Sequence, residues 1–197
     1  MKSDNVYGGQ YWTDQLAHRL KDEKCLERYG YKVYSQNDED GILAEIFRRV
    51  GTTNRVFVEF GIQNGLESNC HNLIMKDWTG LWIEGDDRYY KAAATHFSYP
   101  VEKGRLKLLK AFVTAENINS LLSGAGITGE IDLLSIDIDG NDYHVFKAIT
   151  VINPRVLVIE YNAKMDPETE WVIPYNPARL NTSHRTGHRT TRCLYNK

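Results

Sequence analysis

A carboxylate and two glycines close the first strongly apolar run of this sequence. The run Val56–Phe60 contains Glu59, and Gly61 and Gly65 follow in the pattern E-x-G-x-x-x-G. We expect a buried strand that enters a tight turn, because glycine tolerates backbone angles that other residues resist and lets the backbone approach a ligand closely. The dinucleotide fingerprint G-x-G-x-x-G is absent, and the observed spacing suits an amino-acid moiety and a ribose better than a pyrophosphate. The alternative is a turn with no ligand role.

A second carboxylate stands at the end of the next apolar run. Glu84 ends the run Leu81–Glu84, 25 residues after Glu59. A carboxylate at this place can accept hydrogen bonds from the two ribose hydroxyls of a bound nucleoside. The alternative is an exposed acid at a strand end. Glu59 and Glu84 together indicate a nucleoside site more specifically than either residue alone.

A third polar cluster follows the run Ile131–Asp137. Alternation along a strand places Asp137 and Asp139 on the same side of the chain, at the carboxyl end where open parallel sheets bind ligands. Because burying bare carboxylates is costly, these groups need water, a cation or a ligand. The alternative is that residues 139–142 form only a turn with a helix cap. His144 lies close to this loop in the sequence and is a further candidate for the site.

The apolar runs recur at intervals of about 25 residues, which is the size of a strand–helix unit. The predicted strands are Val56–Phe60, Leu81–Glu84, Leu106–Phe112, Ile131–Asp137 and Val156–Tyr161. The segments between them carry helical patterns, and we expect helices within residues 66–77, 87–97, 115–122 and 142–149. Alternating strands and helices predict an α/β fold with a mostly parallel sheet that is covered on both faces.

The sequence divides into three parts by composition. Residues 1–34 are polar and aromatic, and we interpret them as an N-terminal extension. Residues 35–177 form the predicted domain, which opens with a helix that Ser35 and Asp38 cap in a capping-box pattern. Residues 178–197 contain basic residues and no acid, so we expect a polar tail without helix or strand that leaves the edge of the fifth strand open.

Composition restricts the function and the location. A chain of 197 residues favours one domain, and a net charge of −2 gives no support for nucleic-acid binding. No run is apolar enough for a signal peptide or a membrane span, so we expect no membrane partner. Three widely spaced cysteines fit reduced thiols in the cytoplasm. The six histidines show no metal-ligand spacing, so no residue is assigned as a metal ligand, and the sequence does not determine the oligomeric state.

The three polar motifs, in this order, resemble motifs I, II and IV of class I S-adenosylmethionine-dependent methyltransferases. The matching segments are Glu59–Gly65, Glu84 and Ile136–Gly140. Longer segments of the sequence are similar to FkbM-like methyltransferases. These segments are Tyr34-Ser-Gln, Glu39-Asp-Gly-Ile and Ser135-Ile-Asp-Ile-Asp-Gly-Asn-Asp-Tyr. The resemblance covers about residues 34–177 and implies a Rossmann-like, doubly wound fold. Because that family has an antiparallel edge hairpin after the fifth strand, it also implies a truncated or altered C-terminus with those strands missing.

The resemblance implies S-adenosylmethionine as the methyl donor. The cofactor-binding residues that it implies are Glu59, Gly61, Asn64, Gly65, Glu84 and Asp137. It also implies O-methylation of a small-molecule or glycan acceptor, because FkbM-like proteins often modify sugars, polysaccharides or secondary metabolites. Methyl transfer needs donor and acceptor in line and a group that takes the acceptor proton, for which Asp139 and His144 are the candidates. A divalent cation on Asp137 and Asp139, with Asn141 or Asp142, would instead lower the pKa of the acceptor hydroxyl.

Two other functions stay open from the sequence. A nicotinamide-dependent oxidoreductase is one, although the missing middle glycine argues against it. A non-catalytic nucleoside-binding domain is the other, and the unusual C-terminus is the feature that allows it. Binding of adenosylhomocysteine or of NAD would distinguish the methyltransferase from the oxidoreductase.

Overall fold

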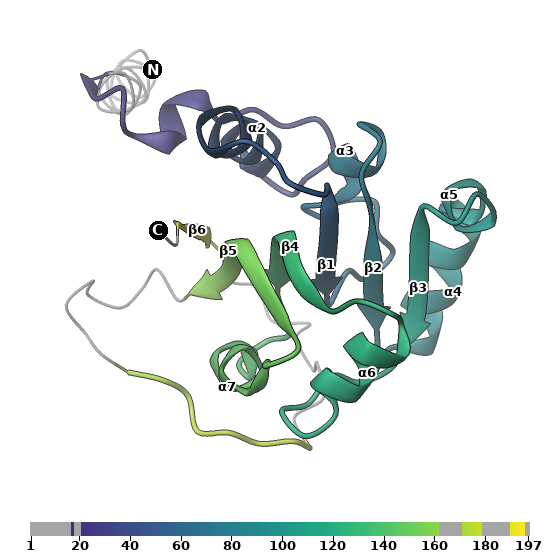
Figure 1. Cartoon of the computed structure of the whole chain (residues 1–197). Helices are drawn as coiled ribbons and strands as arrows, with labels where there is room; N and C mark the ends of the chain where they lie inside the picture. Colours follow the sequence, from purple (N-terminus) through teal and green to yellow (C-terminus); the bar gives the residue numbers. More distant parts are fainter. Residues whose placement is uncertain (1–16, 18–20, 162–170, 179–189, 196–197) are drawn as a thin grey trace, which may run out of the picture.

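The computed structural model describes residue 17 and residues 21–161, 171–178 and 190–195. Its strands form one six-stranded sheet in the order β3-β2-β1-β4-β5-β6. Helices pack on both faces of this sheet (Figure 1). The predicted α/β, Rossmann-like, doubly wound fold is therefore confirmed.

Five parallel strands build most of the sheet, and their predicted cores are confirmed. They are β1 (Val56–Phe60), β2 (Thr79–Glu84), β3 (Leu106–Lys110), β4 (Gly129–Ile136) and β5 (Ile152–Tyr161). A sixth strand, β6 (Thr190–Tyr195), pairs antiparallel with β5. The prediction that the tail forms no strand and leaves the β5 edge open is thus wrong for these residues. Backbone hydrogen bonds suffice to add an edge strand, so the sequence shows no apolar period that would predict β6. Residues 179–189, 196 and 197 lie outside the described residues.

The helices follow the predicted segments, with one large difference. They are η1 (Leu26–Tyr29), α2 (Glu39–Val50), α3 (His71–Ile74), α4 (Asp87–His96), α5 (Ser98–Glu102), α6 (Ile118–Gly124) and α7 (Asp142–Ala148). The helix expected within residues 66–77 is reduced to α3. The backbone N–H groups of Asn69 and Cys70 bond to the carboxylate of Glu59 instead of continuing a helix upstream, and Asp77 has a positive φ of 61° shortly after α3.

The N-terminus of α2 is fastened differently from the predicted capping box. Asp38 is the N-cap residue, but its side chain makes no capping hydrogen bond. Ser35 pairs instead with Asp40: the Ser35 N–H donates to Asp40 Oδ2 at 2.9 Å, and the Asp40 N–H donates to Ser35 Oγ at 3.1 Å. The same Oδ2 accepts the N–H groups of Val33 and Tyr34. The side chain that binds the preceding loop is therefore that of Asp40, the second residue of the helix.

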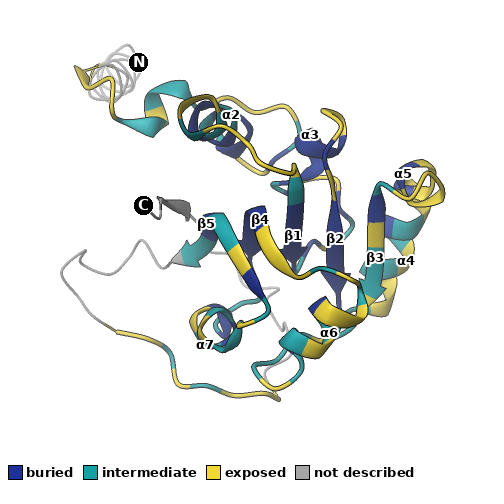
Figure 2. Cartoon of the chain, in the orientation of Figure 1, coloured by how far each residue is buried: buried dark blue, intermediate teal, exposed yellow. Residues whose placement is uncertain are grey.

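Each face of the sheet has its own apolar core. Helices α2, α3 and α4 cover one face, where they pack against Phe57 and Trp82. Helices α6 and α7 cover the other, where they pack against Val58 and Phe60. The alternation along β1 thus sends side chains into both layers, and Figure 2 shows the buried residues along the central strands. Among the residues that the structure describes, no helix has both the length and the apolar character needed to cross a membrane.

A buried ion pair joins four elements at the amino edge of the sheet. Asp132 of β4 is fully buried, and its carboxylate accepts the backbone N–H groups of residues 53–55, which lead into β1. Arg155 of β5 donates to Asp132 Oδ1 at 2.7 Å and also to the last carbonyl groups of α2. Burial acts to raise the pKa of Asp132, but the three backbone donors and Arg155 outweigh it, and the pKa lies below its usual value.

We therefore expect Asp132→Asn to lower the free energy of unfolding by about 2–4 kcal/mol at neutral pH, because it leaves Arg155 and backbone donors incompletely paired. The wild-type carboxylate contributes stability above its unfolded-state pKa and loses it as the pH falls through the lower folded-state pKa. The difference between the proteins should therefore shrink below about pH 4. Urea unfolding at several pH values measures it. Asp77→Asn, at a surface pair with Arg105, is the matched control and should change stability by less than about 0.5 kcal/mol. Equal effects of the two substitutions would contradict the argument.

Candidate active site

The predicted motifs gather at the carboxyl edge of the parallel strands. β1 lies between β2 and β4, and the register aligns Glu59 with both Trp82 and Ser135. Glu84 ends β2, and Asp137 follows β4 directly. The structure thus brings all three motifs to the edge at which open α/β sheets bind ligands.

Glu59 is buried, and its carboxylate is bonded to groups of the protein itself. Oε1 accepts the N–H of Asn69 at 2.9 Å, and Oε2 accepts the N–H of Cys70 at 3.2 Å. The indole N–H of Trp82 donates to Oε2 at 2.9 Å, and the Ser135 hydroxyl lies 3.5 Å from Oε1. Burial raises the pKa of Glu59, although these donors oppose the shift. Glu59 therefore joins β1, β2, β4 and the start of α3, and a direct cofactor contact stays a prediction.

Both glycines of the turn have a packing reason to be glycine. Gly61 has a φ of 74°, and a Cβ added there would lie 1.8 Å from the carbonyl oxygen of Asp137. Gly65 has a φ of 79°, and its added Cβ would lie 2.7 Å from the Trp82 ring and 2.8 Å from the Phe97 ring. The expected need for positive φ and close approach is confirmed. The approaching groups are parts of the protein, so a ligand contact at these glycines stays a prediction.

Glu84 and Asn64 fasten the rest of the turn. The Glu84 carboxylate accepts the N–H of Gln63 at 2.8 Å through Oε2 and the N–H of Asp86 at 2.8 Å through Oε1. Asn64 Oδ1 accepts the N–H of Leu66 at 3.1 Å. Burial raises the pKa of Glu84, with the backbone donors acting against it. Each oxygen of an ionised carboxylate can accept more than one hydrogen bond, so Glu84 retains capacity for the hydroxyls of a ribose.

An aromatic ring that the sequence did not indicate lies beside Glu84. Phe112 is 53% exposed, and its ring covers Gly85, where an added Cβ would lie 2.3 Å from the ring. An exposed aromatic face next to a carboxylate at this edge suits the base of a nucleoside. The sequence prediction placed Phe112 inside a strand, whereas β3 ends at Lys110. The available signal was an aromatic residue just past a strand end at the ligand-binding edge.

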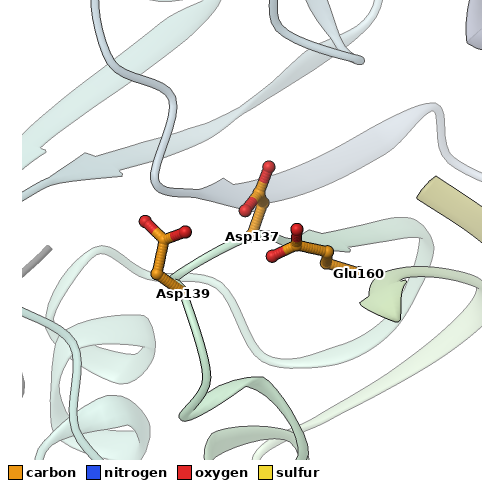
Figure 3. Close-up of side chains that lie close together, drawn as sticks. All are labelled: Asp137, Asp139 and Glu160. Carbon is orange, nitrogen blue, oxygen red and sulfur yellow. The ribbon is translucent and has the colours of Figure 1, made fainter. Parts of the chain in front are cut away.

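Three carboxylates meet after β4 and β5 (Figure 3). Asp137, Asp139 and Glu160 are all half-buried, and one oxygen of each lies within 4.8 Å of the others. The register that pairs Ile136 with Ile159 makes Asp137 and Glu160 neighbours. Asp139 joins them from a loop position with a φ of 57°. Three close like charges disfavour one another, and oxygen ligands at this spacing suit magnesium, manganese or calcium.

The residues after Asp139 position its loop and stay outside this cluster. Asp142 is buried, and its carboxylate accepts the N–H of Ile138 at 2.8 Å and of Gly140 at 2.7 Å. Burial raises the pKa of Asp142 against these donors. The Asn141 amide donates to the carbonyl oxygen of Asn176 at 2.8 Å. Asn141 and Asp142, which the sequence offered as possible cation ligands, thus bond to the loop, whereas Glu160 lies beside Asp137 and Asp139.

His144 is bonded away from the carboxylates. Its Nε2 lies 2.8 Å from the carbonyl oxygen of Ile173, an acceptor, so this nitrogen donates and is not available as a base. Its ring also packs near Tyr175, whose hydroxyl donates to Glu116 at 2.6 Å. Residues 171–178 are thereby fastened to α7 and to the loop before α6. Of the two candidate catalytic residues, the described structure brings only Asp139 into the acidic cluster.

The arrangement can hold a nucleoside and a polar reactant side by side. Glu84 and Phe112 offer a carboxylate and an aromatic face at the end of β2 and β3. The three-carboxylate cluster stands after β4 and β5, with β1 between the two groups in the sheet order. Such an edge can place a cofactor against an oxygen nucleophile and supply a group that takes a proton.

Comparisons with known proteins show the family and the fold of the chain. The model of the methyltransferase FkbM domain matches residues 63–186, which is more than half of the chain. An O-methyltransferase from Bacillus cereus in complex with S-adenosylhomocysteine is similar, with a TM-score of 0.50 and 16% identity over 77% of this chain and 70% of that chain. A protein from Klebsiella pneumoniae assigned as an O-methyltransferase gives a TM-score of 0.49 and 17% identity over 78% and 70%. At 16% identity the Bacillus cereus structure shows a shared fold alone. No curated protein matches significantly.

The contact at Gly61 predicts a large loss of stability on adding one methyl group. Gly61→Ala would place its Cβ against the Asp137 carbonyl at a φ that favours glycine, so we expect destabilisation above about 3 kcal/mol. Gly104→Ala is the matched control, because Gly104 has a φ of 69° and open space around the added Cβ. It should cost about 1 kcal/mol. Thermal unfolding of both variants measures the difference, and similar melting temperatures would show that the close approach is absent.

Proposed function

The chain belongs to the FkbM methyltransferase domain family, and from that premise we propose that it transfers a methyl group from S-adenosylmethionine to a hydroxyl oxygen. The observation that supports this most is the family match over residues 63–186, which contains Glu84, Asp137 and Asp139. These residues lie at one sheet edge, where the exposed Phe112 ring covers Gly85 next to Glu84. The glycine turn precedes them on β1. Donor and acceptor can therefore meet where the strands end.

We assign the nucleoside of the cofactor to Glu84 and Phe112. Glu84 would accept the ribose hydroxyls, and the Phe112 face would pack against the base. Asp137 would face the methionine portion, because it abuts Gly61 at the centre of the edge. The cofactor supplies an activated methyl group on a sulfonium, and the protein must align the acceptor oxygen with it.

We assign the acceptor to the Asp137–Asp139–Glu160 side of the edge. Asp139 would take the proton of the acceptor hydroxyl, since His144 Nε2 donates to a carbonyl oxygen. The carboxylates would also hold a divalent cation, which would lower the pKa of a bound hydroxyl. The three half-buried acids fit such a cation in donor type and spacing.

The acceptor that we propose is a sugar, a polysaccharide or another small hydroxylated molecule. Tyr143 and Trp171 expose 45% and 55% of their surface on α7 and on the segment fastened to it. Exposed aromatic faces suit the apolar C–H faces of sugar rings while the hydroxyls stay hydrogen-bonded. A cytoplasmic location, argued from the cysteine content, belongs to the same proposal.

The cofactor assignment predicts a specific effect of Glu84→Gln. This substitution keeps the size of the side chain but removes the charge that strengthens hydrogen bonds from ribose hydroxyls. We expect adenosylhomocysteine to bind more weakly by about 1–3 kcal/mol in titration calorimetry. Glu130→Gln, at the exposed start of β4, is the control and should bind as the wild type does. Unchanged affinity of Glu84→Gln would refute the ribose assignment, and tighter binding of NAD than of adenosylhomocysteine would favour the oxidoreductase alternative.

The cation assignment predicts manganese binding at the three carboxylates. The wild type should bind one Mn²⁺ in electron paramagnetic resonance titrations, and Asp139→Asn or Glu160→Gln should weaken it at least tenfold, since each removes one charged ligand. Glu130→Gln again serves as the control. Methyl transfer that survives exhaustive chelation, or wild-type protein that binds no Mn²⁺, would remove the cation from the proposal and leave Asp139 as the base.

A further inference from the structure

A cavity of about 360 Å³ lies along α2. Asp40, Ala44, Phe47 and Gly51 line it at intervals of four, three and four residues, which is one stripe of a helix. The opposite wall comes from residues 73–78, between α3 and β2. Arg55 and Trp78 directly precede β1 and β2, so the cavity opens at the amino edge of the sheet. Its volume lies within the usual range for ligand sites.

One end of this groove holds a buried carboxylate with an unused oxygen. Asp40 is 2% exposed. Its Oδ2 accepts the N–H groups of Val33, Tyr34 and Ser35, whereas Oδ1 has no hydrogen-bond partner among the described residues. Burial acts to raise the pKa of Asp40, but the backbone donors outweigh it, so the group is ionised at neutral pH. A buried anionic oxygen without a donor is costly, and an ammonium group would satisfy it.

The other end of the groove carries positive charge. Arg55 and Lys76 line the cavity and are both exposed. In the part of the chain that the structure describes, no ion pair involves either side chain. Two such cations suit a carboxylate. Between the two ends the walls are apolar, with Ala44, Leu73 and the edge-to-face pair of Phe47 and Trp78, whose ring centroids are 4.8 Å apart.

The carboxylate of Asp40 and the cationic end of the groove are farther apart than the length of one amino acid. The stripe from Asp40 to Gly51 spans about 16 Å at 1.5 Å per helical residue. An extended tripeptide covers about 10 Å, and the long side chains of Arg55 and Lys76 can reach the remainder. A fatty acid would leave the carboxylate of Asp40 without a hydrogen-bond donor. An amine without a carboxylate would extend toward Arg55 and Lys76 and offer these cations no anion.

We propose that this groove binds a short apolar peptide with free termini, its ammonium group at Asp40 and its carboxylate at Arg55 and Lys76. The cationic end of the groove lies at the amino edge, and the residues that line the groove include none of those assigned to methyl transfer. The proposal therefore does not depend on the proposed function. A peptide bound here would bridge α2 to the loop before β2.

Three tripeptides test the charge pattern. Leu-Ala-Leu, its N-acetyl form and its C-terminal amide share the same body but carry two, one and one terminal charges. We expect saturable one-to-one binding of Leu-Ala-Leu in titration calorimetry and at least tenfold weaker binding of each blocked peptide. Absence of binding at millimolar concentration, or equal affinities of the three peptides, would overturn the proposal. Dodecanoate binding better than the peptide would identify an acyl-chain groove and would overturn it as well.

Two variants locate the site without touching the buried Asp40. Lys76→Ala should weaken Leu-Ala-Leu at least fivefold and leave the affinity of the amide unchanged, and Lys103→Ala on the far side of β2 is the matched control. Ala44→Phe should fill the groove and abolish peptide binding, while the melting temperature and adenosylhomocysteine affinity stay at wild-type values. Full peptide affinity in Ala44→Phe, or an equal loss in Lys103→Ala, would place the peptide elsewhere and refute the site.

Discussion

The buried carboxylate of Glu59 is the interaction on which the candidate active site depends. It sits between its two register neighbours, Trp82 and Ser135, and it accepts the first N–H groups of the segment that becomes α3. Burial of a charge is costly unless donors surround it, and here they come from three neighbouring elements. Without Glu59, the turn that contains Gly61 would lose the rigid surface against which it packs.

The parallel register explains why the acids of this edge are close to one another. In a parallel pair the register continues past the last paired residues, so Asp137 and Glu160, which follow the pair Ile136–Ile159, become neighbours. Their mutual repulsion is an energetic cost that packing alone does not remove. A cation or a proton that binds at such a site relieves this repulsion, because it neutralises part of the negative charge. Asp142 adds to the cluster by holding Asp139 in a left-handed conformation through its bonds to the loop backbone.

Much of this arrangement could be predicted from the sequence, because buried parallel strands appear there as continuous apolar runs. The five strand cores and the place of Glu84 follow from such runs. Asp137 and Asp139 are close, as predicted, but not through strand alternation, because β4 ends at Ile136 and Asp139 lies in a loop with a φ of 57°. Features made by single side chains reaching across the fold could not be predicted. Examples are the Ser35–Asp40 pairing, the shortening of α3 by Glu59, and the bond of His144 to Ile173. β6 was missed because an edge strand needs little apolar surface.

The two edges of the sheet use carboxylates in opposite ways. At the amino edge, Asp132 is fully paired with backbone donors and Arg155, so its charge contributes to stability. At the carboxyl edge, Glu84 also accepts backbone N–H groups, but Asp137, Asp139 and Glu160 lie close to one another. A fold that satisfies its charges at one edge can tolerate this crowding at the other. The stability that the Asp132 network contributes at the amino edge thus offsets part of the cost of placing three acids together at the carboxyl edge.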